Sequence, residues 1–134
     1  MQTLLTYSST LFALGHYFIA GTFILSGLKT LTSWDQGITF LKTKDIPFER
    51  LILTISILWQ LLGGGLLLLS GWQRAGCILL ILYTAFAGLR FYPFWRMSNV
   101  EQYINTIFFL TNLGLIGGLL ILLVEFSRNL APAL

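Results

Sequence analysis

Four long apolar runs are the feature that most constrains how this chain can fold. They cover residues 11–28, 51–70, 75–91 and 104–124, more than half of the 134 residues. A helix needs about 20 mostly apolar residues to cross the roughly 30 Å hydrocarbon core of a bilayer. Because lipid offers the backbone no hydrogen bonds, such runs must be helices rather than open strands. The runs predict an all-α membrane protein, in which residues 1–134 form a single four-helix transmembrane domain.

The composition supports this class and excludes several others. Only 10% of the residues are charged, whereas soluble domains carry about 25%. With one cysteine, Cys77, and one histidine, His16, the chain cannot form an internal disulfide or a zinc site of the usual kind. We therefore expect no metal, no intrinsic cofactor and an inert Cys77 in the core. The net charge of +3 comes mostly from residues that flank the apolar runs, which suits lipid headgroups rather than nucleic acid.

The first loop, residues 29–50, is the longest. Ser33 and Gln36 have the spacing of a capping box, which marks the start of a helix. Three apolar residues of this loop can share one helical face: Trp34, Ile38 and Leu41. The pattern predicts a short amphipathic helix that lies in the membrane interface. Pro47 then breaks the chain before the second run.

The remaining loops and the charges predict a topology. The turn at residues 71–74 is so short that the second and third helices must form an antiparallel hairpin. The first and third loops carry Lys29, Lys42, Lys44, Arg50, Arg90 and Arg96, whereas the opposite side carries Arg74 and Arg128. The positive-inside rule then places both long loops in the cytoplasm and both termini outside.

Polar residues within apolar spans are candidates for function. His16 lies in the first span, as a proton-exchanging group or quinone partner, or as a histidine bonded to a neighbouring helix. Gln60 lies near the middle of the second span, where it either bonds to another helix or lines a cavity. The sequence shows no nucleophile–base pair and no paired carboxylates. The sequence therefore identifies no catalytic residue and leaves open whether the protein is an enzyme.

The third and fourth spans contribute three more candidates. Arg90 lies about one turn from the end of its span, and either extends to the interface or forms a fixed cation at a cavity mouth, partnered by Gln60 or water. Asn105 and Asn112 are seven residues apart and so lie on one helical face. Either they bind a ligand or they pack against another helix. The neighbouring Gly114 and Gly118 are typical of close helix packing.

Six short motifs, in order along nearly the whole chain, resemble the DoxX family of four-helix membrane proteins. They are Ser26-Gly27-Leu28-Lys29 (similar to Ser-Gly-x-x-Lys), Ile46-Pro47-Phe48 (Gly-x-Pro), Gln60-Leu61-Leu62-Gly63-Gly64 (Glu-x-x-Gly-Gly), the turn Gly71-Trp72-Gln73-Arg74, Phe91-Tyr92-Pro93-Phe94-Trp95 (Phe-His-x-Phe-Trp) and Asn112-Leu113-x-Leu115-x-Gly117-Gly118 (Asn-Leu-x-Leu-x-Gly-Gly). The sequence departs from the family pattern at Gln60, where many members have Glu, and at Tyr92, where many have His. Both departures remove a readily titratable group.

The resemblance implies a role in a redox, quinone-handling or stress-resistance system of the bacterial cytoplasmic membrane. We expect a quinone-like or other hydrophobic small molecule to bind among six polar side chains: His16, Gln60, Arg90, Tyr92, Asn105 and Asn112. Two alternatives stay open. The chain could be a non-catalytic membrane subunit of a quinone-linked oxidoreductase with a redox partner protein, or a structural or assembly partner without a ligand. Membrane lipid and further copies of the chain are the other expected partners.

Overall fold

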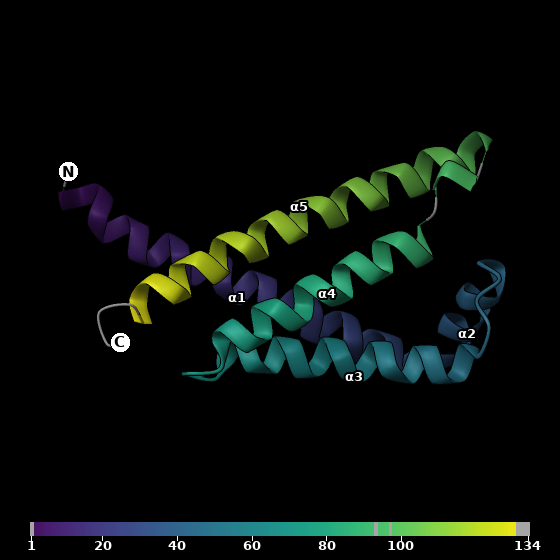
Figure 1. The fold of residues 1–134 in the computed structure, drawn as a ribbon, viewed down its shortest axis with the longest axis horizontal. Coiled ribbons are helices and arrows are strands. Elements are labelled where there is room, and N and C mark those ends of the chain that lie inside the picture. Colours follow the sequence, from purple (N-terminus) through teal and green to yellow (C-terminus); the bar gives the residue numbers. More distant parts are fainter. Residues whose placement is uncertain (1, 93, 97, 131–134) are drawn as a thin grey trace.

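The computed structural model describes residues 2–92, 94–96 and 98–130, with the side chains of residues 10–92, 95, 96 and 98–128. This part of the chain forms five α-helices and one short 3-10 helix, and it contains no strand (Figure 1). The elements are α1 (Gln2–Thr32), α2 (Trp34–Thr43), α3 (Glu49–Leu68), α4 (Gln73–Phe91), η1 (Phe94–Arg96) and α5 (Asn99–Leu130).

Four of these helices, α1, α3, α4 and α5, are long and apolar enough to cross a membrane. The chain is therefore a multi-pass all-α membrane protein, as the apolar runs predict. Two helices extend well beyond the predicted spans, since α1 has 31 residues and α5 has 32. At 1.5 Å per residue each is about 47 Å long, more than the roughly 30 Å hydrocarbon core. Their flanks contain neither Gly nor Pro, so nothing in the sequence ends the helix where the apolar run ends.

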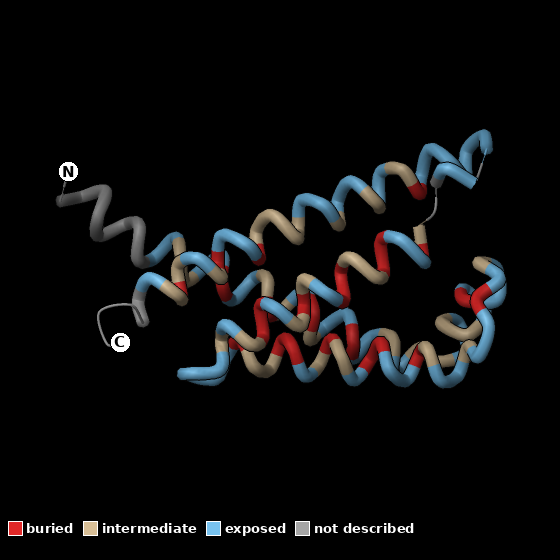
Figure 2. Tube along the Cα trace, viewed as in Figure 1, coloured by how far each residue is buried: buried red, intermediate tan, exposed pale blue. Residues whose placement is uncertain are grey.

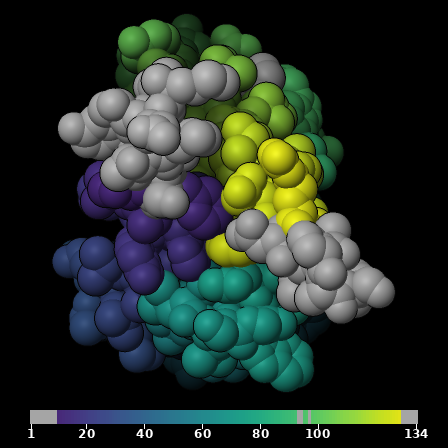
Figure 3. Space-filling view, turned by 90° about the vertical axis from the view of Figure 1, so that its left-hand side faces the viewer, coloured from purple at the N-terminus to yellow at the C-terminus, as the bar shows by residue number. Residues whose placement is uncertain are grey.

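The transmembrane helices pack in the order α1, α3, α4, α5. Helix α3 contacts both α1 and α4, and α4 also contacts α5. At one end of the molecule α1 meets α5, where the rings of Phe12 and Phe126 lie 5.5 Å apart. Figure 3 views this end, with α1 in purple, α5 in yellow and the α3–α4 turn in teal. The α3–α4 pair is the predicted hairpin, closed by Gly71 in the left-handed region at φ 87°.

Close backbone contact holds the hairpin together. A Cβ atom at Gly76 of α4 would lie 2.9 Å from the carbonyl oxygen of Gly63 and 2.9 Å from the amide nitrogen of Leu67, both on α3. The core of the protein lies along this contact, where Leu67, Cys77 and Leu80 are fully buried. Burial is accordingly concentrated in α3 and α4, whereas much of α5 is exposed (Figure 2).

The predicted amphipathic helix is present as α2, but its surroundings differ from the expectation. Leu41 is buried, and Trp34 and Ile38 pack against the core. The apolar face therefore lies on protein rather than only on the interface. The predicted capping box is wrong, because the Ser33 side chain makes no capping hydrogen bond. The Ser33 amide bonds to the Lys29 carbonyl, so α1 leads almost directly into α2 and leaves no isolated helix end to cap.

The α2–α3 connection turns sharply, as the proline predicts. Asp45 at φ 55° and Phe48 at φ 56° are both in the left-handed region, on either side of Ile46 and Pro47. Such a conformation costs a bulky L-residue roughly 1–2 kcal/mol. Ile46 is buried in the core, which anchors the turn and fixes the position of the preceding Lys44.

Candidate functional site

A polar cluster lies where α3 faces α4 inside the membrane-spanning region. The side-chain nitrogen Nε2 of Gln60 donates a 2.7 Å hydrogen bond to the phenolic oxygen of Tyr83. Ser56, one turn before Gln60 on α3, lines the same cavity as Gln60 and Tyr83. All three side chains are buried. Polar groups at this depth face protein because lipid offers them no partner.

The cluster forms one wall of a cavity of about 230 Å³. Helices α1, α2, α3 and α4 all contribute, and Tyr92 follows directly after α4. The lining residues are Ser26, Thr30, Gly37, Phe40, Leu41, Leu53, Ser56, Gln60, Tyr83, Phe91 and Tyr92. Hydroxyl and amide groups thus share the cavity with four aromatic rings, while none of the lining side chains carries a formal charge.

Gln60 has a hydrogen-bonding group to spare. One end of its amide is bonded to Tyr83, and the other end has no hydrogen-bond donor or acceptor among the described residues. A side-chain amide can make up to four hydrogen bonds. No fully enclosed side-chain nitrogen or oxygen in the described part of the chain lacks a partner. The free end of the Gln60 amide therefore has access to open space, and Gln60 lines the cavity.

Tyr92 connects the cavity to the neighbouring elements. Its ring lies 6.4 Å from that of Phe40 on α2 and 5.3 Å from that of Phe108 on α5, measured between centroids. These separations are typical of favourable aromatic pairs. Burial raises the pKa of the Tyr92 phenol, so the group stays neutral at physiological pH and remains a hydrogen-bond donor.

His16 lies elsewhere, in α1 where this helix meets α5 and the end of α3. Its Nε2 atom donates to the carbonyl of Leu67 in the last turn of α3, and its ring packs on Phe126. The last carbonyls of a helix have no partner within the helix, and His16 satisfies one of them. A separate pocket of about 320 Å³ at this end includes His16 and Arg74. This contact corresponds to a histidine bonded to a neighbouring helix.

Arg90 and Asn105 lie near the opposite end. Arg90 is exposed in the last turn of α4 and lines a third pocket together with Lys44 and Glu101. Of the two partners expected for Arg90, Gln60 or a water, Gln60 lines a different pocket and donates to Tyr83 instead. Asn105 is buried, accepts a 2.9 Å hydrogen bond from Lys44 Nζ and donates to the Glu101 carbonyl. It links α5 to the connection after α2.

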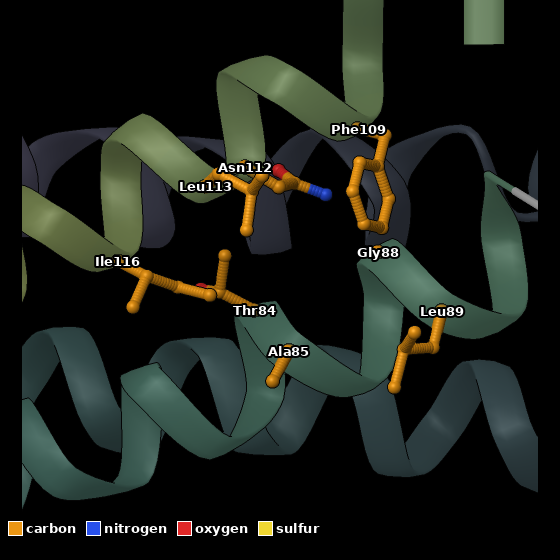
Figure 4. Close-up of a pocket in the computed structure, with 8 residues that line it drawn as sticks. All are labelled: Thr84, Ala85, Gly88, Leu89, Phe109, Asn112, Leu113 and Ile116. Carbon is orange, nitrogen blue, oxygen red and sulfur yellow. The ribbon is translucent and has the colours of Figure 1, made fainter. Parts of the chain in front are cut away.

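Asn112 lies in a shallow groove between α4 and α5. Figure 4 shows its amide beside Phe109 and Gly88, among otherwise mostly apolar side chains. The groove has a volume of about 180 Å³. Of the two glycines expected to pack closely, Gly118 lies against Ile19 on α1, whereas Gly114 has no neighbour within 4 Å of where a Cβ would be.

The six candidate side chains therefore do not converge. Only Gln60 and Tyr92 line the same cavity, and the expectation of a single site built from all six is wrong. Sequence reasoning missed Tyr83, which completes the polar cluster. Its hydroxyl near the middle of a span, 23 residues after Gln60 along the chain, was the signal that could have found it.

A family model described as DoxX matches residues 11–93, more than half of the chain. The chain belongs to the DoxX family. The DoxX match runs from α1 to just beyond α4, so it includes the Gln60–Tyr83 cluster and Tyr92, while α5 lies outside it. No curated protein and no solved structure matches this DoxX chain.

Proposed function

We propose that this DoxX-family membrane protein binds an uncharged, quinone-like small molecule in the cavity between α1, α2, α3 and α4. The observation that carries the proposal is the buried Gln60–Tyr83 pair, which leaves one end of the Gln60 amide free at the cavity. Burying a polar group without a partner costs roughly 1–3 kcal/mol by mutational estimates. A ligand or water that bonds to the free amide end removes that cost.

The chemistry of the lining suits a small ring with oxygen substituents. A quinone carbonyl accepts hydrogen bonds, whereas a quinol hydroxyl also donates them. Gln60 Nε2 donates to the Tyr83 oxygen, so the free end of the Gln60 amide is Oε1, which can accept a hydrogen bond from a quinol hydroxyl. The Tyr83 hydroxyl hydrogen is not used in this bond and can donate to a quinone carbonyl. The pair can therefore serve either redox form. The rings of Phe40, Phe91 and Tyr92 offer aromatic surface on which a flat ring can stack.

The chemistry of the lining also bears on whether the chain itself carries out the redox reaction. Among the described residues that line the cavity there is no Asp, Glu, His, Lys or Arg. A quinone takes up protons and electrons when it is reduced, and these side chains offer no readily titratable group for the protons. This favours a binding subunit, placed in the bacterial cytoplasmic membrane, that presents its ligand to a redox partner protein.

Binding of a soluble quinone analogue to the detergent-solubilised protein tests the proposal. Gln60→Leu and Tyr83→Phe should each weaken binding about tenfold, which corresponds to the loss of one hydrogen bond. Asn112→Leu is the matched control, because it removes a side-chain amide from the separate α4–α5 groove, and it should bind like the parent. Equal losses in Gln60→Leu and Asn112→Leu, or no binding to the parent, would contradict the proposal.

A further inference from the structure

The third pocket, which Arg90 lines, is separate from the cavity but lies near the same end of the transmembrane helices. Its volume is about 430 Å³. It is lined by Thr43, Lys44, Asp45, Arg90, Arg96, Ser98 and Glu101. Three of these side chains are cationic and two are anionic, so the lining carries one net positive charge. The quinone-like ligand proposed above is uncharged and has no use for such a lining.

The two arginines of this pocket have no carboxylate partner. The only ion pair within the described residues joins Arg128 to Glu125, although Asp45 and Glu101 line the same pocket as Arg90 and Arg96. A guanidinium presents a planar fork of donors that matches the oxygens of a carboxylate or phosphate. Two such forks at one pocket leave a strong capacity for binding an anion unused.

The third cation is held in a fixed position. Lys44 Nζ donates to Asn105 Oδ1 at 2.9 Å and lies 5.5 Å from the centre of the Phe40 ring. Asn105 is itself buried and bonded to the Glu101 carbonyl. The ammonium group is therefore directed by the fold rather than left free in solvent, which lowers the entropy lost when it contacts a ligand.

The position of the pocket relative to the membrane indicates the source of the anion. Arg90 is one residue from the end of α4, and Glu101 is in the first turn of α5. Both helices cross the membrane, so their ends lie near the level of the lipid headgroups. Leu89 and Trp95 beside the arginines are about half exposed, as suits contact with acyl chains and the interface.

We propose that this pocket binds the phosphate group of an anionic phospholipid headgroup, with Arg90 and Arg96 as its bidentate donors and Lys44 as a third contact. The single net positive charge of the lining complements the single negative charge of a phosphodiester such as phosphatidylglycerol. A free phosphate ion offers the same oxygens but lacks acyl chains to lie on the exposed apolar surface nearby. The proposal does not depend on the quinone cavity, because the two sites share no lining residue.

Native mass spectrometry of the full chain in a non-ionic detergent, with added phosphatidylglycerol, tests this site. Each basic residue near a membrane surface strengthens attraction to anionic lipid roughly fivefold, so Arg90→Gln with Arg96→Gln should weaken binding about 25-fold. The matched control is Arg74→Gln with Arg128→Gln, which removes the same charge from the other side and should change binding less than about twofold. Arg90→Lys with Arg96→Lys keeps the charge but loses the forks, and should fall between them.

Two further arms separate the sources of the phosphate group. Phosphatidylcholine, which has no net charge, should bind more weakly than phosphatidylglycerol and should be insensitive to the arginine substitutions. Inorganic phosphate at millimolar concentration should not displace the lipid. Equal losses in the test and control pairs would show general charge attraction and overturn the proposal. Displacement by inorganic phosphate, or phosphate binding without phosphatidylglycerol binding, would overturn the assignment to lipid.

Discussion

The side-chain nitrogen of Gln60 donates a 2.7 Å hydrogen bond to the hydroxyl of Tyr83, across the α3–α4 contact and within the membrane-spanning part of the chain. Gln60 belongs to the motif that resembles Glu-x-x-Gly-Gly, in which the resemblance implies a carboxylate. A neutral amide can hold the same place without the cost of burying a charge. What it retains is the capacity to donate and accept hydrogen bonds, and that capacity is the basis of the proposed ligand site.

The strength of this pair can be measured with a double-mutant cycle. Gln60→Leu, Tyr83→Phe and the double variant should give a coupling of about 0.6 kcal/mol, and no more than about 1.7, because interhelical hydrogen bonds in membranes contribute modestly. The measurement is the free energy of unfolding in detergent. A coupling near zero would mean that the two side chains act independently and that the pair is not formed in the membrane.

Two glycines of the α3–α4 hairpin should respond in opposite directions to alanine. Gly76→Ala puts a Cβ within 2.9 Å of the α3 backbone, so it should destabilise the protein by about 1–3 kcal/mol through overpacking. Gly65 has no neighbour within 4 Å, and Gly65→Ala should stabilise the helix by up to about 1 kcal/mol. Thermal unfolding of both variants checks the hairpin, and similar effects at the two positions would contradict the close contact.

Lys44 should make stability depend on pH in the alkaline range. Burial lowers its pKa below the ordinary 10.5, and the nearby charge of Glu101 only partly opposes this. Between the lowered pKa and 10.5 the unfolded chain binds more protons than the folded one, so the Lys44 contribution to stability rises with pH. The melting temperature of the parent minus that of Lys44→Met should therefore increase as the pH approaches 10.5. A difference that stays constant or shrinks would contradict the burial of this amine.

The topology remains a prediction from charge alone. A reporter enzyme fused after Leu134 should be active outside the cytoplasm, and one fused after Lys44 should be active inside it, because the basic loops stay on the cytoplasmic side. Activity of the first fusion only in the cytoplasm would reverse the orientation. The pocket of Arg90 and Arg96 would then face the outer leaflet.

Much of the fold could be predicted because hydropathy is a property of each run by itself. The four spans, the hairpin at residues 71–74 and the break at Pro47 all follow from local sequence. Helix ends were harder to predict. Helices α1 and α5 continue beyond their apolar runs, since residues such as Thr32 and Glu101 are tolerated once a helix leaves the hydrocarbon core.

The site was less predictable because helical spacing fixes only which residues share a face. It does not say which helix that face meets. Asn105 and Asn112 share a face of α5, yet one binds Lys44 and the other lies in a groove against α4. The partner of His16 is a backbone carbonyl, a group that every residue carries and that no sequence pattern marks.

The most direct test of the proposed function is to find where a bound quinone touches the chain. A photoreactive quinone analogue, crosslinked to the protein in native membranes and mapped by mass spectrometry, should label residues of the cavity, such as Ser26 and Tyr92, together with the Gln60–Tyr83 cluster. An excess of unlabelled quinone should suppress this labelling, as should Gln60→Leu. Labelling centred on the α4–α5 groove around Asn112, or on the end that holds His16, would contradict the account.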